Sequence, residues 1–320
     1  MLLTFDETAA LILKGKHLHI AGTENLIKKL PKGKWLGGST EYFMTKNGGI
    51  TTGEKLFVTE LPYDTVNIKV YDENNMSSIT ADVFGNGFTI VILPFDSVVH
   101  KLYAAKAPEF ENIYVNNIVG WISGLNLSKS GQTPIAVNGE TGEAFSDKAV
   151  AIHIGVPSDK FVSLGIINIF EQDLDAPTIE FKEEGFTITT CLVDGKEVVF
   201  ADYIEKNNID TKLPIVGNYS GVGINISFKA ISDGVVNFYA PVFPGIKYKI
   251  AKPIENYVEA FHSKLKNYNE VEAAFSCNCI LNFLYGELEG KEVEVFFGPI
   301  TFGEIAFQLV NQTLVYVSVA

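Results

Sequence analysis

The sequence contains no arginine: all 25 residues counted as lysine or arginine are lysines. The planar guanidinium group, which binds carboxylates and phosphates through paired hydrogen bonds, is therefore missing, and mechanisms that need an arginine clamp or an arginine finger are excluded. The 38 acidic residues give a formal net charge of −13, and this negative field repels nucleic acids and anionic membrane surfaces. We expect neither a nucleic-acid partner nor insertion into a membrane.

Cysteines and long apolar segments are also scarce. Three cysteines are too few to crosslink 320 residues, and their odd number leaves at least one unpaired, which favours a reducing, cytoplasmic compartment. The longest apolar runs, such as residues 88–95, have the length of a strand and fall short of the roughly 18 residues that cross a bilayer. Asp6 and Glu7 follow the start of the chain closely, where a signal peptide would carry positive charge, so we expect no secretion signal.

The common cofactor and metal motifs are missing as well. Residues 286–291 contain the glycine and lysine of a phosphate-binding loop, but one residue too few separates them. His17 and His19 would share one face of a strand, yet no third ligand accompanies them. We therefore expect no cofactor and no metal.

Apolar residues, in contrast, make up 47% of the chain, enough for the core of one large or two ordinary domains. Short apolar and β-branched runs bounded by turn residues outnumber the helical patterns, which are irregularly spaced, and this favours an α+β fold over a doubly wound parallel sheet. No flexible linker interrupts the chain. We expect two tightly packed β-rich halves, residues 1–199 and 200–320, with mixed sheets covered by a few helices.

Local signals place several elements. Thr4 and Glu7 have the spacing of a capping box and predict a helix over residues 5–14. Asp96 is expected to cap a helix that ends before Pro108. Asp194-Gly195 between two β-rich runs predicts a tight hairpin, since that turn needs positive φ at both positions. An apolar face over residues 254–268 predicts another helix, and the turn-rich residues 124–142 are expected to form exposed loops.

Two cysteines in Cys-x-Cys spacing are the first candidate for chemistry. Cys277 could be a thiolate nucleophile, with His262 on the upstream helix as its base, or the pair could bind a soft metal or form a strained disulfide. The alternative is that Cys277 ends a buried strand as a small hydrophobic residue, as unpaired cysteines often do.

Two glycine-rich segments are the second candidate. Gly37, Gly38, Ser39 and Thr40 follow an apolar run and could present backbone N–H groups and hydroxyls to a small anion, or could be an ordinary tight turn. Gly303-Glu304 places an acid after a buried strand, an arrangement that suits the rim of a pocket.

The same segments resemble FIST domains, the F-box and intracellular signal transduction family. The resemblance rests on the turn-like segment 36–40, on Phe275-Ser276-Cys277, and on Phe297-Gly298 through Gly303-Glu304-Ile305, and it is most specific near the C-terminus. It implies an α+β sensory module that binds a small molecule such as an amino acid. The family's usual Gly-Arg-Gly stretch after the cysteine is replaced here by Asn278-Cys279-Ile280, so any ligand contact made by that arginine is lost.

Three hypotheses about function follow. The first is a ligand-binding protein that holds a small polar metabolite between its halves, with Gly37 and Gly38 binding an anionic end and Glu304 a cationic end; this would not be an enzyme. The second is a thiol-dependent hydrolase or transferase that uses Cys277. The third is a scaffold that binds a protein partner or a second copy of itself.

Overall fold

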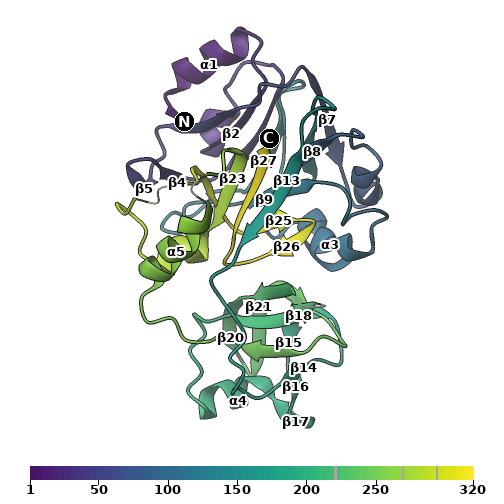
Figure 1. Ribbon diagram of the computed structural model, residues 1–320, viewed down its shortest axis with the longest axis vertical. Coiled ribbons are helices and arrows are strands. Elements are labelled where there is room, and N and C mark those ends of the chain that lie inside the picture. The colour runs from purple at the N-terminus through teal and green to yellow at the C-terminus, as the bar shows by residue number, and fades with distance from the viewer. Residues whose placement is uncertain (220–221, 269, 293–294) are drawn as a thin grey trace.

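The computed structural model describes residues 1–219, 222–268, 270–292 and 295–320. The chain forms two parts, which we call the body (residues 1–168 and 251–320) and the lobe (residues 169–250), and both chain ends lie in the body (Figure 1). With 41% strand and 18% helix in several mixed sheets, the predicted α+β class is confirmed.

Three six-stranded sheets build the body. Sheet A contains, in spatial order, β1 (Leu2–Leu3), β6 (Leu56–Glu60), β2 (Leu18–Gly22), β3 (Trp35–Ser39), β10 (Ala136–Asn138) and β11 (Glu143–Phe145). Sheet B contains β26 (Gln308–Val310), β25 (Glu304–Ala306), β9 (Ile118–Ser123), β8 (Gly87–Pro94), β12 (Ala149–Gly155) and β7 (Thr65–Tyr71). Sheet C contains β13 (Val162–Ile167), β27 (Leu314–Val319), β23 (Ala273–Cys279), β24 (Gly298–Thr301), β4 (Tyr42–Thr45) and β5 (Gly48–Thr51).

The sheets of the body are stacked between helices. Strands of sheets A and C contact strands of sheet B, so sheet B faces both of them. Helices α1 (Phe5–Leu13) and α2 (Glu24–Ile27) pack on sheet A, α3 (Val98–Lys106) packs on sheet B, and α6 (Ile280–Tyr285) packs on sheet C. Helix α5 (Tyr257–Leu265) lies at the outside of the body near the lobe (Figure 1). Short 3₁₀ helices span Met76–Thr80, Ala107–Glu109 and Lys266–Tyr268.

The lobe has its own sheets and an aromatic core. One sheet contains β17 (Lys196–Val199), β16 (Thr190–Val193), β14 (Ile179–Glu180), β22 (Tyr248–Ile250), β18 (Ile215–Tyr219) and β19 (Val222–Ile226); the other contains β15 (Gly185–Ile188), β21 (Val235–Val242) and β20 (Phe228–Ser232). Helix α4 (Phe200–Lys206) completes the lobe. Its interior is filled by rings that contact one another edge to face or tilted, namely Phe181, Phe200, Phe228, Phe238 and Tyr248.

The predicted division at residues 199 and 200 does not follow the sheets. That position lies inside the lobe, where β17 runs directly into α4. Sheet C also joins strands from both predicted halves, since β4 and β5 come from the first and β23, β24 and β27 from the second. The lobe is instead an insertion between β13 and α5, and the chain returns from it to complete the body.

Of three predictions made from neighbouring residues, two are confirmed and one is wrong. The capping box of α1 is confirmed, with Thr4 and Glu7 bonded to each other's backbone. The hairpin turn is confirmed too: Asp194 has φ of 47° and Gly195 of 78°. The N-cap of α3 is Ser97 and not Asp96, which has φ of 61° and lies before the helix.

The expectation of exposed loops over residues 124–142 is wrong in part, because Ala136–Asn138 form the buried strand β10 beside β3.

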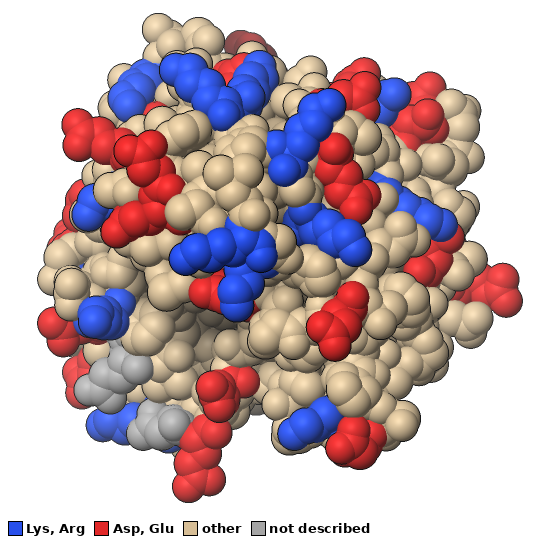
Figure 2. Space-filling model, turned by 90° about the horizontal axis from the view of Figure 1, so that it is seen from above, with Lys and Arg blue, Asp and Glu red and all other residues tan. Residues whose placement is uncertain are grey.

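Lysines and acids are interspersed over the face of the body seen in Figure 2. Among the described residues, no helix is long and apolar enough to span a membrane.

Candidate functional site

The Gly37–Gly38 segment, predicted as an anion-binding turn, is the interior of strand β3. Both glycines pair with β2 on one side and with β10 on the other, so the strand ladders use their backbone groups. A Cβ atom on Gly38 would lie 2.7 Å from Cη2 of Trp121 and 2.8 Å from Cγ2 of Ile92. The glycines allow close packing between sheets A and B, and the predicted anion nest is wrong.

Ser39 and Thr40 fasten the end of β3 to the rest of the body. The Ser39 hydroxyl donates to the carbonyl of Gly124 at 2.8 Å and accepts from the N–H of Ile135 at 2.9 Å. The Thr40 hydroxyl donates to the carbonyl of Ile300 at 2.8 Å. Both residues are buried, so their polar atoms serve the fold and are not presented to a ligand.

Glu304 is fully buried at the start of β25. Its Oε1 accepts from the Thr301 hydroxyl at 3.0 Å, and its Oε2 accepts from the Thr313 hydroxyl at 2.9 Å. Burial raises the pKa of Glu304 to about 8, although these hydrogen bonds act to lower it. The side chain is therefore mostly protonated at neutral pH, and it does not serve as the predicted site for a cationic group. The preceding Gly303, with φ of 147°, forms the turn into β25.

Cys277 and Cys279 lie beside Glu304, so the structure does bring these predicted residues together. Both thiols are buried, and the Sγ of Cys277 donates to the carbonyl of Gly120 in β9 at 3.5 Å. Burial, with the nearby Glu304 as a second cause, raises the pKa of both thiols well above the ordinary value. A thiolate nucleophile needs the opposite shift.

His262 does not assist Cys277. It lies half-buried on α5, at the outside of the body, whereas the Cys277 side chain faces sheet B in the interior. Among the described residues, no hydrogen bond or ring contact involves both side chains. The geometry therefore contradicts the Cys277–His262 pair and supports the alternative, a small hydrophobic residue in a strand.

An open cleft of about 820 Å³ lies where the lobe joins the body. The connection at residues 168–175 forms one part of its lining, the lobe contributes residues 216–218 and Gly223, and the body contributes Lys252, Lys264 and Tyr268. Its volume is in the range of small-molecule sites. We call it the junction cleft.

Hydrogen bonds across the junction hold the cleft in shape. The amides of Asn168 in the body and Asn225 in the lobe bond to each other reciprocally, at 2.9 and 3.0 Å. Asn225 also donates to the carbonyl of Asn311, and the Ser227 hydroxyl donates to the side chain of Gln312 at 2.6 Å. These groups are buried or half-buried and fix the lobe against the body, and one of them, Asn168, lines the cleft.

Charges of both signs line the junction cleft without being paired. Among the described residues, no salt bridge or side-chain hydrogen bond occupies the ammonium group of Lys252 or Lys264. Glu171 and Asp175 also line the cleft and pair with no lysine within the same part of the chain. Phe170 and Tyr268 add aromatic surface. With Asp173 as a third acid, the lining of the cleft thus carries charges of both signs.

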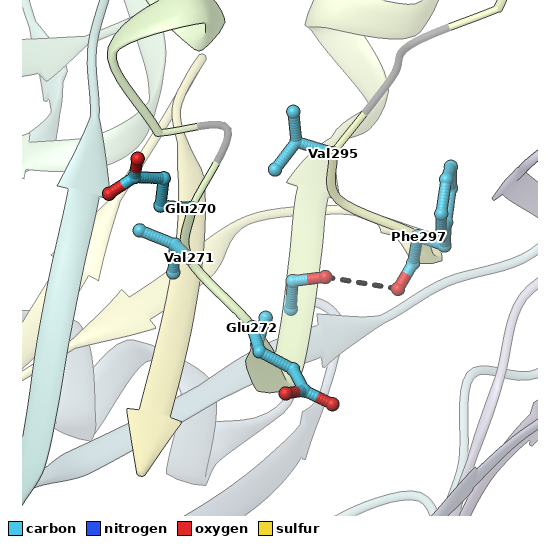
Figure 3. A pocket seen from close by; sticks show the side chains of 7 residues that line it. Glu270, Val271, Glu272, Val295 and Phe297 are labelled. Atoms are coloured by element: carbon cyan, nitrogen blue, oxygen red, sulfur yellow. Dashed lines mark hydrogen bonds between the residues drawn. The ribbon is translucent and has the colours of Figure 1, made fainter. Parts of the chain in front are cut away.

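A second hollow, of about 540 Å³, lies beside β23 and is less suited to a ligand with a carboxylate. Figure 3 shows Val295 and Phe297 across from the segment that carries Glu270 and Val271. The hydroxyl of Ser276 is used in a hydrogen bond to the carbonyl of Phe297 at 3.0 Å. The described residues around this hollow supply two carboxylates and no cation.

The sequence analysis did not single out the residues of the junction cleft. The acidic run at residues 171–175, which stands just before Pro177, is the one local signal. Lys252 and Lys264 come from a part of the chain some eighty residues later, and only the return of the chain from the lobe brings them to the same cleft.

Comparison with known proteins gives a family and no function. The model of a family described as a family of unknown function, DUF6976, matches residues 3–320. No curated protein matches the sequence significantly.

Proposed function

The chain belongs to the DUF6976 family, and because the function of that family is unknown, we propose from the junction cleft that the protein binds a small zwitterionic metabolite, an amino acid being the simplest example. One observation carries the proposal: lysines and acids that pair with no described side chain of opposite charge line one cleft between the lobe and the body. A zwitterion would satisfy both signs of charge at once.

The charged residues of the cleft would bind the two charged groups of the ligand. Lys252 and Lys264 would bind the carboxylate as point charges, which requires no arginine. Glu171 and Asp175 would bind the ammonium group, and Phe170 and Tyr268 would contact an apolar side chain. This arrangement replaces the earlier expectation, in which Gly37, Gly38 and Glu304 held the two ends of the ligand.

Three further points bear on the choice between ligand binding and the alternatives. The resemblance to FIST domains implies a sensory module that binds small molecules. The scaffold hypothesis is favoured where the pocket is filled by side chains, which is true of the pocket predicted around Gly38 and Glu304 but not of the junction cleft, which is open. The raised pKa of Cys277 argues against the thiol-dependent enzyme.

Calorimetric titration with the common L-amino acids tests the proposal. We expect at least one of them to bind, and we expect its analogues lacking either the carboxylate or the amine to bind at least about tenfold more weakly, since each loses a charged contact. The double variant Lys252→Ala/Lys264→Ala should lose affinity by a similar factor.

Lys46→Ala is the matched control, because Lys46 is exposed on the turn between β4 and β5 and lines none of the cavities described. Wild-type protein that binds no amino acid in the titration, or a double variant that binds as well as the control, would overturn the assignment of this cleft.

A further inference from the structure

Strands β23 and β24 of sheet C separate toward their N-terminal ends. Among the described residues they pair in parallel over residues 278–279 of β23 and residues 300–301 of β24, at the end of both strands. At the first residue of β24, Gly298, an added Cβ atom would lie 2.0 Å from the carbonyl oxygen of Ser276, so the strands still touch there. Upstream of this contact lies the hollow of about 540 Å³ described above. We call this hollow the sheet slot.

Figure 3 looks into the sheet slot. Val295 and Phe297 lie on one wall, and residues 270–273, which run into β23, lie on the other. The hydrogen bond from the Ser276 hydroxyl to the carbonyl of Phe297 closes the end nearest β24. None of the described lining residues also lines the junction cleft, so the two are separate sites.

The backbone on both walls has hydrogen-bonding groups to spare. The N–H groups of Val295, Phe296 and Phe297 bond to no carbonyl of a described residue, and neither do those of Glu270 and Glu272. Along its other edge, β23 is paired with β27. Unpaired edges of a sheet are the places where an extended segment of another chain adds as a strand. The sheet slot therefore has the form of a gap for one further strand.

The side chains of the sheet slot indicate what that strand would contain. Exposure alternates along residues 270–273, with Glu270 and Glu272 exposed and Val271 and Ala273 half-buried. No described lining residue is a cation that could pair with the two carboxylates. Side chains on neighbouring strands pair with those on the same face of the sheet, so lysines would match the glutamates and small apolar residues would match the other two. The opposite wall adds further apolar surface.

We propose that the sheet slot binds an extended, lysine-containing segment of a partner protein, which adds as a strand between β23 and the residues that precede β24. Its backbone would bond to both walls, and its lysines would lie near Glu270 and Glu272. A second copy of this chain is disfavoured as the occupant, because each copy carries a formal net charge of −13. The assignment does not depend on the amino-acid site proposed for the junction cleft.

Acetyl-Lys-Val-Lys-Val-Lys-amide is the probe, and hydrogen exchange of the backbone amides of residues 295–297 is the readout. Binding should slow their exchange in a saturable manner, because the amides become bonded. The same peptide with N-methylated valines keeps its charge but loses backbone donors, and it should bind at least about tenfold more weakly. Acetyl-Glu-Val-Glu-Val-Glu-amide should leave the exchange unchanged. Unaltered exchange with the lysine peptide, or equal binding of the N-methylated peptide, would overturn the proposal.

Glu270→Gln/Glu272→Gln is the test variant, because both side chains are exposed and their change leaves the fold intact; it should bind the lysine peptide at least about tenfold more weakly. Glu54→Gln/Glu140→Gln is the control, since it removes the same charge from exposed positions outside the slot, and it should bind as wild type does. Equal affinities of the two variants would contradict the assignment. Free protein that sediments as a dimer, with the amides of residues 295–297 already protected, would assign the slot to a second copy and overturn the proposal.

Discussion

The indole N–H of Trp121 donates a hydrogen bond to Nε2 of His19, 2.9 Å away, and so joins sheet B to sheet A inside the body. Burial lowers the pKa of His19 to about 3, which keeps the imidazole neutral and able to accept. The edge of the same ring contacts Phe275 of sheet C, with centres 4.9 Å apart. One histidine thus links all three sheets of the body, and the indole it holds lies over Gly38.

Gly38→Ala should destabilise the protein by about 1–3 kcal/mol, the usual cost of inserting a methyl group into a packed core. The added Cβ would lie 2.7 Å from the Trp121 ring and 2.8 Å from Ile92, so the indole must move away from its bond with His19. Urea unfolding measures the change. Gly85→Ala is the control, since Gly85 is exposed with no atom near the added Cβ, and it should change stability by less than about 0.5 kcal/mol. Equal stability of the two variants would contradict this packing.

Glu304 should reduce the stability of the protein as the pH rises from about 4.5 to about 8. Its pKa is about 8 when folded and near 4.5 when unfolded, so over this range the folded protein binds the additional proton. The contribution of this group to the free energy of unfolding then falls with rising pH and levels off above about 8.

Glu304→Gln keeps an oxygen acceptor for Thr301 and Thr313 but does not titrate. Its free energy of unfolding, taken relative to wild type, should therefore rise across the same pH range in urea unfolding experiments. Glu140→Gln, which changes an exposed acid, should follow wild type at every pH. A difference between Glu304→Gln and wild type that does not vary with pH would show that Glu304 is ionised in the folded state.

The three thiols should not react with iodoacetamide in the folded protein. Burial raises the pKa of Cys191 to about 12 and those of Cys277 and Cys279 well above their ordinary value, and the thiolate is the reactive form. Mass spectrometry should find all three labelled only after unfolding. Rapid labelling of Cys277 in the folded protein would instead restore the hypothesis of a nucleophilic cysteine.

Sequence alone predicted the features whose causes are local. The capping box of Thr4 and Glu7 and the turn at Asp194-Gly195 need only neighbouring residues, so their chemistry is visible in a short window. The α+β class followed from the balance of strand and helix patterns in the same way.

One local prediction failed, since Ser97 and not Asp96 caps α3; the other predictions that failed depend on distant residues. Gly37-Gly38 has the composition of a turn, and only the Trp121 ring, supplied by another sheet, shows why glycine is needed inside a strand. Cys277 and Glu304 do lie near each other, but their burial, which reverses the chemistry expected of them, comes from the stacking of sheets B and C. The junction cleft was missed because the insertion of the lobe creates it.

Glu41, next to Thr40, is a buried carboxylate that the sequence did not reveal. Oε2 of Glu41 accepts from Lys129 at 2.6 Å and from Asn126 at 2.9 Å, and Oε1 accepts from Gln132 at 2.7 Å. Burial alone would raise the pKa of Glu41, but these hydrogen bonds outweigh it and hold the pKa below its ordinary value. The carboxylate thus fastens the loop after β9 to the end of β3.

Lys129→Met should cost about 1 kcal/mol of stability at neutral pH, a modest value because the lysine is half exposed and screened by solvent. The loss should shrink as the pH falls through the pKa of Glu41, since a protonated carboxyl no longer needs the cation. Combining Lys129→Met with Glu41→Gln should cost less than the sum of the two single changes, because each removes the same ion pair. Strictly additive costs, or a cost of Lys129→Met that is the same in acid, would contradict a stabilising ion pair between Lys129 and Glu41.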